Sequence, residues 1–141
     1  MGAESKRSMS WIFIDTTAQG QFRAGMLRHG RALPVFKGRG GRVLPKIARV
    51  VGRAGLKRAD GICVVAGPGS FSAVRSGVIL ANLLAKLFGK KLVGVTSDDA
   101  RDLSALREGL EKGEWNPVSY VAPVYDAEPN ITVAPSHRLQ T

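Results

Sequence analysis

The hydrophobic pattern of the chain opens with three short apolar runs of the kind that form β-strands. They cover Trp11–Asp15, Phe22–Leu27 and Ala32–Phe36, and links containing glycine separate them. Because these links are short, we expect the three strands to form an antiparallel meander.

A helical spacing follows the meander. Apolar residues recur three and four positions apart, at Val43, Leu44, Ile47, Val50, Val51 and Ala54. The spacing predicts an amphipathic helix that ends at Gly55 and the turn through Asp60. Another face of this helix carries a basic stripe, which consists of Arg42, Lys46, Arg49, Arg53 and Lys57.

The rest of the chain alternates between strand and helix patterns. It predicts a strand at 61–66, a helix at about 71–88, a strand at 91–95, a helix at about 98–112, and one or two strands within 118–125 and 131–133. The order β-β-β-α-β-α-β-α indicates a mixed sheet, antiparallel and then parallel through β-α-β units, flanked by helices. This order matches a single ribonuclease-H-like lobe of the actin, sugar-kinase and Hsp70 superfold.

Length and composition agree with one domain. The 141 residues, 44% of them hydrophobic, suffice for one core. We expect a disordered basic tail over residues 1–9, a single lobe over 10–135 and a terminal tail over 136–141. The single cysteine, Cys63, lies within an apolar strand and is expected in the core.

The expected location is the cytoplasm. One cysteine cannot form an intramolecular disulfide, which is typical of a reducing compartment. The apolar run at 9–14 is too short for a signal peptide, and the stretch 78–89 contains Asn82 and Lys86, so we expect no membrane span.

Charge is distributed unevenly along the chain. The net charge is +10, yet residues 16–59 contain no acidic side chain, whereas residues 98–141 contain eight acidic residues against four basic ones. The molecule should therefore be polarised, with a polyanion or an acidic protein face meeting its amino-terminal half.

A glycine-rich turn links the strand at 61–66 to the helix at 71–88. Gly67 and Gly69 can adopt the backbone conformations that a tight turn requires, and Ser70 is placed to cap the helix. Free N–H groups at Gly67, Gly69, Ser70 and Phe71 form a candidate anion site, and the alternative is a tight strand-to-helix crossover without a ligand.

No catalytic constellation, metal site or cofactor site is predicted. His29 and His137 have no metal-ligand spacing to each other or to Cys63, and the glycine-rich turn lacks the lysine of a phosphate-binding loop. Asp15 ends the first strand, where sugar kinases place an aspartate near magnesium. The alternative role for Asp15 is a side-chain cap on the turn at Thr17.

The helix at 71–88 is apolar around nearly its whole circumference. A single sheet cannot bury all of that surface, so the helix needs a second cover. The preceding basic helix, through its apolar side, and a partner protein are both candidates for this cover.

Residues 67–77 resemble the Gly-Pro-Gly-Ser-Phe-Thr-Gly-Leu-Arg-Ile-Gly signature of the TsaB (YeaZ) family, Gcp-like proteins of tRNA threonylcarbamoyladenosine biosynthesis. The segments 11–17, 43–47 and 93–97 resemble family motifs in the same order, so the resemblance spans residues 10–97. The chain departs from the family at Arg39, where a histidine is common, and at Ser72, Ala73 and Ser76. The resemblance covers one lobe, and we expect the family's second lobe to be absent.

The resemblance implies a non-catalytic scaffold or activator subunit that binds a TsaD-like transferase, or a second copy of itself, through its two long helices. The expected interface consists of Arg42, Lys46, Arg49, Arg53, Ser72, Arg75, Ile79 and Asn82. The basic helix could also contact tRNA. Two other functions stay open: a stand-alone basic module that binds RNA or another polyanion, and a phosphate-transferring enzyme suggested by Asp15 and the Gly-Pro-Gly turn.

Overall fold

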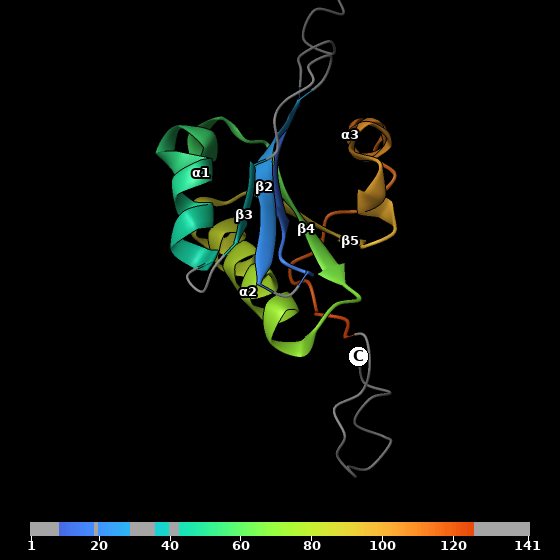
Figure 1. Cartoon of the computed structure of the whole chain (residues 1–141). Coiled ribbons are helices and arrows are strands. Elements are labelled where there is room, and N and C mark those ends of the chain that lie inside the picture. The colour runs from blue at the N-terminus through green and yellow to red at the C-terminus, as the bar shows by residue number, and fades with distance from the viewer. Residues whose placement is uncertain (1–8, 19, 29–35, 40–42, 126–141) are drawn as a thin grey trace, which may run out of the picture.

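The computed structural model describes residues 9–18, 20–28, 36–39 and 43–125 and is organised around one mixed sheet (Figure 1). The strands are β1 (Ser10–Asp15), β2 (Gln21–Arg28), β3 (Phe36–Arg39), β4 (Gly61–Gly67) and β5 (Lys91–Thr96). They lie in the order β3-β2-β1-β4-β5, with β2 antiparallel to β1 and β3, and with β1, β4 and β5 parallel. The predicted change from an antiparallel meander to parallel strands is confirmed, as is the ribonuclease-H-like fold class.

Helices cover both faces of the sheet. Figure 1 shows α1 (Val43–Arg58) and α2 (Phe71–Phe88) on one side, and α3 (Leu103–Lys112) on the other, preceded by the 3-10 helix η2 (Asp99–Arg101). Each side has its own buried cluster. Ile12, Ile14, Ile62 and Val64 point to α1 and α2, whereas Phe13, Cys63, Val65 and Val93 point to α3. Alternation along β1 and β4 thus places Cys63 in the core, as predicted.

α2 is the crossover between the parallel strands β4 and β5. It buries Val74, Gly77, Val78, Ala81 and Ala85 on the sheet side. The helix ends at Gly89, which adopts the left-handed conformation (φ 63°) and donates its N–H to the carbonyl of Ala85. By length and composition α2 could cross a membrane. The core helix of a soluble protein passes the same test. Here α2 connects the paired strands β4 and β5 and packs against the sheet.

Three predicted elements differ in extent. β3 begins at Phe36, where the predicted strand ends, and residues 32–35 lie outside the described part of the chain. α1 continues past Gly55 to Arg58, with a break at Gly52 (φ 70°, ψ 170°). The last predicted helix is divided at Asp102, whose carboxylate accepts the N–H groups of Ser104 and Ala105 and caps α3.

The segment 118–125 is not a strand. Its backbone meets the sheet through the N–H of Val118, which donates to Leu92, and the N–H of Val124, which donates to Ala66. One isolated bridge joins Gly69 and Tyr125. The predicted strand at 131–133 and the two terminal tails, apart from Met9, lie outside the described residues.

Candidate functional site

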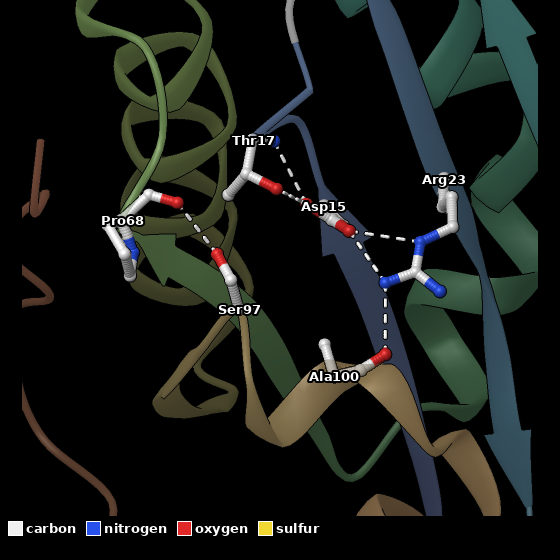
Figure 2. A network of polar contacts seen from close by, with 6 residues as sticks. All are labelled: Asp15, Thr17, Arg23, Pro68, Ser97 and Ala100. Atoms are coloured by element: carbon white, nitrogen blue, oxygen red, sulfur yellow. Dashed lines mark hydrogen bonds and ion pairs between the residues drawn. The ribbon is translucent and has the colours of Figure 1, made fainter. Parts of the chain in front are cut away.

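The carboxyl ends of β1, β4 and β5 meet at one edge of the sheet, where ligands bind in many α/β proteins. Asp15 ends β1, the turn after Gly67 follows β4, and Ser97 follows β5. Figure 2 shows that polar side chains tie the loops at this edge to one another.

Both carboxylate oxygens of Asp15 are engaged (Figure 2). Oδ1 accepts hydrogen bonds from the backbone N–H (2.9 Å) and the hydroxyl (2.7 Å) of Thr17. The predicted side-chain cap on this turn is therefore confirmed. Oδ2 accepts two bonds from the guanidinium of Arg23, from Nε at 3.0 Å and from Nη2 at 2.7 Å.

Arg23 is a site residue that the sequence analysis missed. Besides its ion pair with Asp15, its Nη2 donates to the carbonyl of Ala100 at 3.1 Å, and its guanidinium carbon lies 5.3 Å from the centre of the Phe13 ring. Asp15 and Arg23 are directly paired across β1 and β2. Counting outward from the turn of the predicted hairpin would have placed the two residues opposite each other. Opposite charges on facing positions attract, so an ion pair could then have been predicted.

The ion pair determines what this edge can do chemically. A cation held at Asp15 would have to displace Arg23, because the guanidinium already neutralises the carboxylate. Within residues 9–18, 20–28, 36–39 and 43–125, no group of three or more His, Cys, Asp or Glu side chains could hold a metal ion. A pocket of about 210 Å³ beside the pair is lined by Asp15, Ala18, Gln21, Phe22 and Arg23.

The turn after β4 is packed against backbone. A Cβ at Gly67 would meet the carbonyl oxygen of Val124, and one at Gly69 would meet that of Thr17. A carbonyl oxygen thus lies beside each glycine, and at Gly69 the side chain of Val74 lies closer still. The carbonyl of Pro68 accepts a hydrogen bond from the hydroxyl of Ser97 at 2.7 Å (Figure 2).

The start of α2 also differs from expectation. Ser70 occupies the N-cap position, but its side chain makes no capping bond, and its Oγ has no partner among the described residues. The ring of Phe71 lies 4.7 Å from that of Tyr125 and 5.0 Å from the guanidinium carbon of Arg75. The first turn of the helix thus has aromatic and cation contacts, and the backbone bond from the N–H of Val74 to the carbonyl of Ser70, but no serine cap.

The structure brings most of the predicted interface residues to one helical layer. Ser72, Arg75 and Ile79 are exposed on α2, and Lys46, Arg49 and Arg53 are exposed on α1. Arg42 lies outside the described residues. Asn82 is half-buried, and its amide faces the 118–125 segment rather than solvent.

Asn82 joins α2 to the 118–125 segment. Its Oδ1 accepts the N–H of Val121 at 2.9 Å, and its Nδ2 donates to the carbonyl of Val121 at 3.0 Å and to that of Val78 at 2.9 Å. The amide thus satisfies both backbone groups of Val121, as a neighbouring strand would. This engagement leaves the amide no free donor for a partner's backbone.

The exposed side of α2 is apolar. Phe71, Ile79, Leu83 and Leu87 fall on one row of residues four positions apart, which we call the α2 ridge, and Arg75 occupies the remaining position of the row. Ile79, Leu83 and Leu87 are 55%, 52% and 66% exposed. Although α1 packs beside α2, it leaves this ridge uncovered. Leu83 and Leu87 were not among the expected interface residues, although their spacing from Ile79 places them on the same row.

The same helical layer is free of acidic residues. α1 contains five basic side chains and α2 contains two, and neither contains an aspartate or glutamate. The acidic residues Asp98, Asp99, Asp102, Glu108 and Glu111 belong to the η2–α3 side. The uneven charge expected along the sequence therefore becomes a difference in charge between the two faces of the sheet.

Comparisons with known proteins agree on the family. The model of the family described as "TsaD: tRNA N6-adenosine threonylcarbamoyltransferase" matches residues 41–134, more than half of this chain. A tRNA N6-adenosine threonylcarbamoyltransferase of Ralstonia pickettii (strain 12J) is 42% identical over 69 residues, which are 48% of this chain and 20% of that protein.

Two solved structures share the fold. YeaZ from Pseudomonas aeruginosa matches with a TM-score of 0.53 and 26% identity, over 62% of this chain and 43% of YeaZ. A structure described as an uncharacterized protein with similarity to the peptidase YeaZ from Pseudomonas aeruginosa gives the same TM-score and coverage at 23% identity, which shows the fold alone. The chain thus spans less than half the length of these proteins. It belongs to the Gcp-like TsaD family of tRNA-modification proteins, as a TsaB/YeaZ-like member.

Proposed function

We propose that this chain is a non-catalytic cytoplasmic partner subunit in the transfer of a threonylcarbamoyl group to adenosine in tRNA. Its task is to dock a TsaD-like transferase through the layer formed by α1 and α2. The observation that carries this proposal is the α2 ridge, whose large apolar side chains are exposed on a helix that packs its other side on the sheet.

The spacing of the ridge favours a helical partner. Residues four apart form the ridges that fit into the grooves of a facing helix. Exposed aliphatic side chains that lie next to one another commonly mark protein interfaces, whereas isolated ones do not. Ile79, Leu83 and Leu87 are neighbours along α2, so the ridge offers a continuous docking line.

A scaffold role also suits the edge of the sheet. The aspartate at the end of β1 forms an ion pair with Arg23 and caps Thr17, so its carboxylate is engaged in holding loops together. Carbonyl oxygens line Gly67 and Gly69. Both features hold the loops at this edge together, as a scaffold requires.

The test is co-purification of the full chain with the TsaD-like transferase of the same organism, followed by size-exclusion chromatography. We expect a stable complex with the native chain and none with Ile79→Asp/Leu83→Asp, because two carboxylates would be desolvated in the apolar contact. The native chain should also restore the modified nucleoside in cells depleted of their TsaB.

A matched control is Val118→Asp. Val118 is similarly apolar and 46% exposed, but it lies outside the α1–α2 layer, so this variant should bind the transferase like the native chain. If the native chain forms no complex and restores no modified nucleoside, the proposed function is wrong. Equal loss of binding in both variants would remove the ridge as the docking site.

A second candidate function, direct binding of RNA or another polyanion, is favoured by the basic face of α1. Arg49, Arg53 and Lys57 are exposed and have no carboxylate partner among the described residues. Reversing these three charges should weaken RNA binding and flatten its dependence on salt. An unchanged RNA affinity would eliminate this function.

A further inference from the structure

The guanidinium of Arg23 lies among oxygen atoms at the carboxyl end of β1. It donates three hydrogen bonds to two oxygens: Nε and Nη2 donate to Oδ2 of Asp15 at 3.0 and 2.7 Å, and Nη2 also donates to the carbonyl of Ala100 at 3.1 Å. Figure 2 shows that both oxygens meet at the same nitrogen. A carboxylate and a backbone carbonyl are also the oxygen ligands that hard divalent cations take.

The carboxylate of Asp15 needs a positive charge beside it, because it is largely shielded from water. Its side chain is 9% exposed, and an unpaired carboxylate is costly in such a place. Thr17 donates two hydrogen bonds to Oδ1 but brings no charge. Sugar kinases, which share this superfold, place magnesium near the aspartate that ends their first strand. In this chain the positive charge comes from β2.

We infer that Arg23 is a built-in replacement for a divalent metal ion. Its guanidinium occupies a cation site formed by Oδ2 of Asp15 and the carbonyl of Ala100, and it closes that site to metals. Guanidinium groups stay charged in proteins, so this edge of the sheet is neutralised and held together without an ion from solution. The inference goes beyond the proposed function, because it concerns the edge of the sheet and not the α1–α2 layer.

Removal of the arginine should open a weak site for a hard cation such as Ca²⁺. The two oxygens lie beside the pocket of about 210 Å³ that Ala18, Gln21 and Phe22 help to line, and waters in this pocket could complete the shell of the ion. Ca²⁺ binds oxygens at about 2.3–2.6 Å and tolerates irregular geometry, whereas Mg²⁺ demands a near-ideal octahedron. Since the site has a single carboxylate, we expect a dissociation constant on the order of 1 mM.

The test is urea denaturation of the native full chain and of Arg23→Ala, each in EDTA and in CaCl2 at about ten times the expected dissociation constant. We expect calcium to raise the urea midpoint of Arg23→Ala, because the ion binds only the folded state. The midpoint of the native chain should not change. Titration calorimetry with CaCl2 should show binding at least about tenfold tighter to Arg23→Ala than to the native chain.

Three variants serve as controls. Arg23→Lys keeps a cation in the site and should not respond to calcium. Arg23→Ala/Asp15→Asn lacks the carboxylate and should not respond either. Arg101→Ala removes the arginine of another ion pair, with Asp98, whose side chains are 82% and 83% exposed. This variant changes the net charge equally but should gain no site, because its freed carboxylate is already in water.

The test does not depend on the stability of Arg23→Ala. If this variant is unfolded in EDTA, calcium should restore its fold, and Arg23→Ser is a second variant with an opened site. The inference is overturned if neither variant responds to calcium more than Arg101→Ala does, if the response survives Asp15→Asn, or if the native chain responds as strongly. None of these measurements uses the transferase, so the absence of a transferase complex would overturn the proposed function alone.

Discussion

Arg23 and Asp15 face each other across β1 and β2, and the guanidinium donates two hydrogen bonds to a single carboxylate oxygen of Asp15. The pair is partly shielded, with the side chains 28% and 9% exposed. Because Nη2 also reaches the carbonyl of Ala100, one side chain joins β2, the end of β1 and η2. The aspartate at the end of the first strand is thereby held in a structural contact.

The first prediction concerns this contact. Arg23→Ala leaves a poorly solvated carboxylate with Thr17 as its remaining partner and should lower the free energy of unfolding by about 1–3 kcal/mol. Arg23→Lys keeps the charge but loses the planar fork, so its effect should be smaller. Urea denaturation measures both variants. Native-like stability of Arg23→Ala would show that the pair does not stabilise the fold.

A second prediction concerns the close approach of α2 to β1. The hydroxyl of Thr16 donates to the carbonyl of Ala73 and accepts the N–H of Gly77 at 3.1 Å. A Cβ at Gly77 would lie 2.5 Å from Oγ1 of Thr16. Gly77→Ala should therefore destabilise by about 1–3 kcal/mol, although alanine is the better helix former.

The control is the double variant Thr16→Ala/Gly77→Ala, in which the clashing hydroxyl is gone. Its loss of stability should be smaller than the sum of the two single losses, since the sites share a contact. Gly52→Ala is no substitute for this control, because Gly52 has a positive φ. Strictly additive losses would locate the cost of Gly77→Ala elsewhere.

The elements with strong periodicity were predictable from the sequence. The apolar runs of β1 and β4 and the helical spacing of α1 and α2 are set by local burial, and the structure places these elements close to the expected bounds. The boundaries that failed depend on single polar contacts. Asp102 caps α3 and divides the predicted helix. The 118–125 segment reads as a strand, although a side chain, Asn82, bonds both backbone groups of Val121.

The site was less predictable, because its contacts join residues distant in sequence. Thr17 was inferred as the partner of Asp15 since it lies two residues away. Arg23 required the register of β1 against β2, and Ala100 lies 77 residues further along the chain. Exposure of the α2 ridge likewise depends on how α1 packs beside α2. The spacing of apolar residues in α2 indicated more apolar surface than one sheet can bury. It could not show which part of that surface α1 leaves uncovered.

Asn82 gives a third prediction. Asn82→Ala would deprive the N–H and the carbonyl of Val121 of their partner and release the 118–125 segment from α2. We expect faster hydrogen exchange at Val121 and a loss of about 1–3 kcal/mol in the free energy of unfolding. Exchange in β1 and β4 should change only through the global stability. Equal protection of Val121 in both proteins would mean that the segment is held without Asn82, by packing and by the bonds of Val118 and Val124 to the sheet.

A fourth prediction uses Cys63 as an internal probe of opening. Burial, and secondarily the charge of Asp99, raises the pKa of its thiol well above the usual range. Since the thiolate is the nucleophile, iodoacetamide at pH 8 should modify Cys63 only when the chain unfolds, and the rate should follow the unfolded population as urea is added. Rapid modification of the native chain without urea would contradict the buried position.

The same shift predicts how stability depends on pH. A cysteine thiol in an unfolded chain has a pKa of about 8.5, whereas in the folded state the Cys63 thiol keeps its proton to higher pH. The stabilisation is therefore complete below about pH 8.5 and is lost as pH rises toward the folded pKa, by up to about 1.4 kcal/mol per pH unit. Cys63→Val removes this titration while keeping an apolar side chain. Between pH 8 and 10 the native protein should lose more unfolding free energy than the variant does, and parallel pH profiles of the two proteins would show that Cys63 is not responsible.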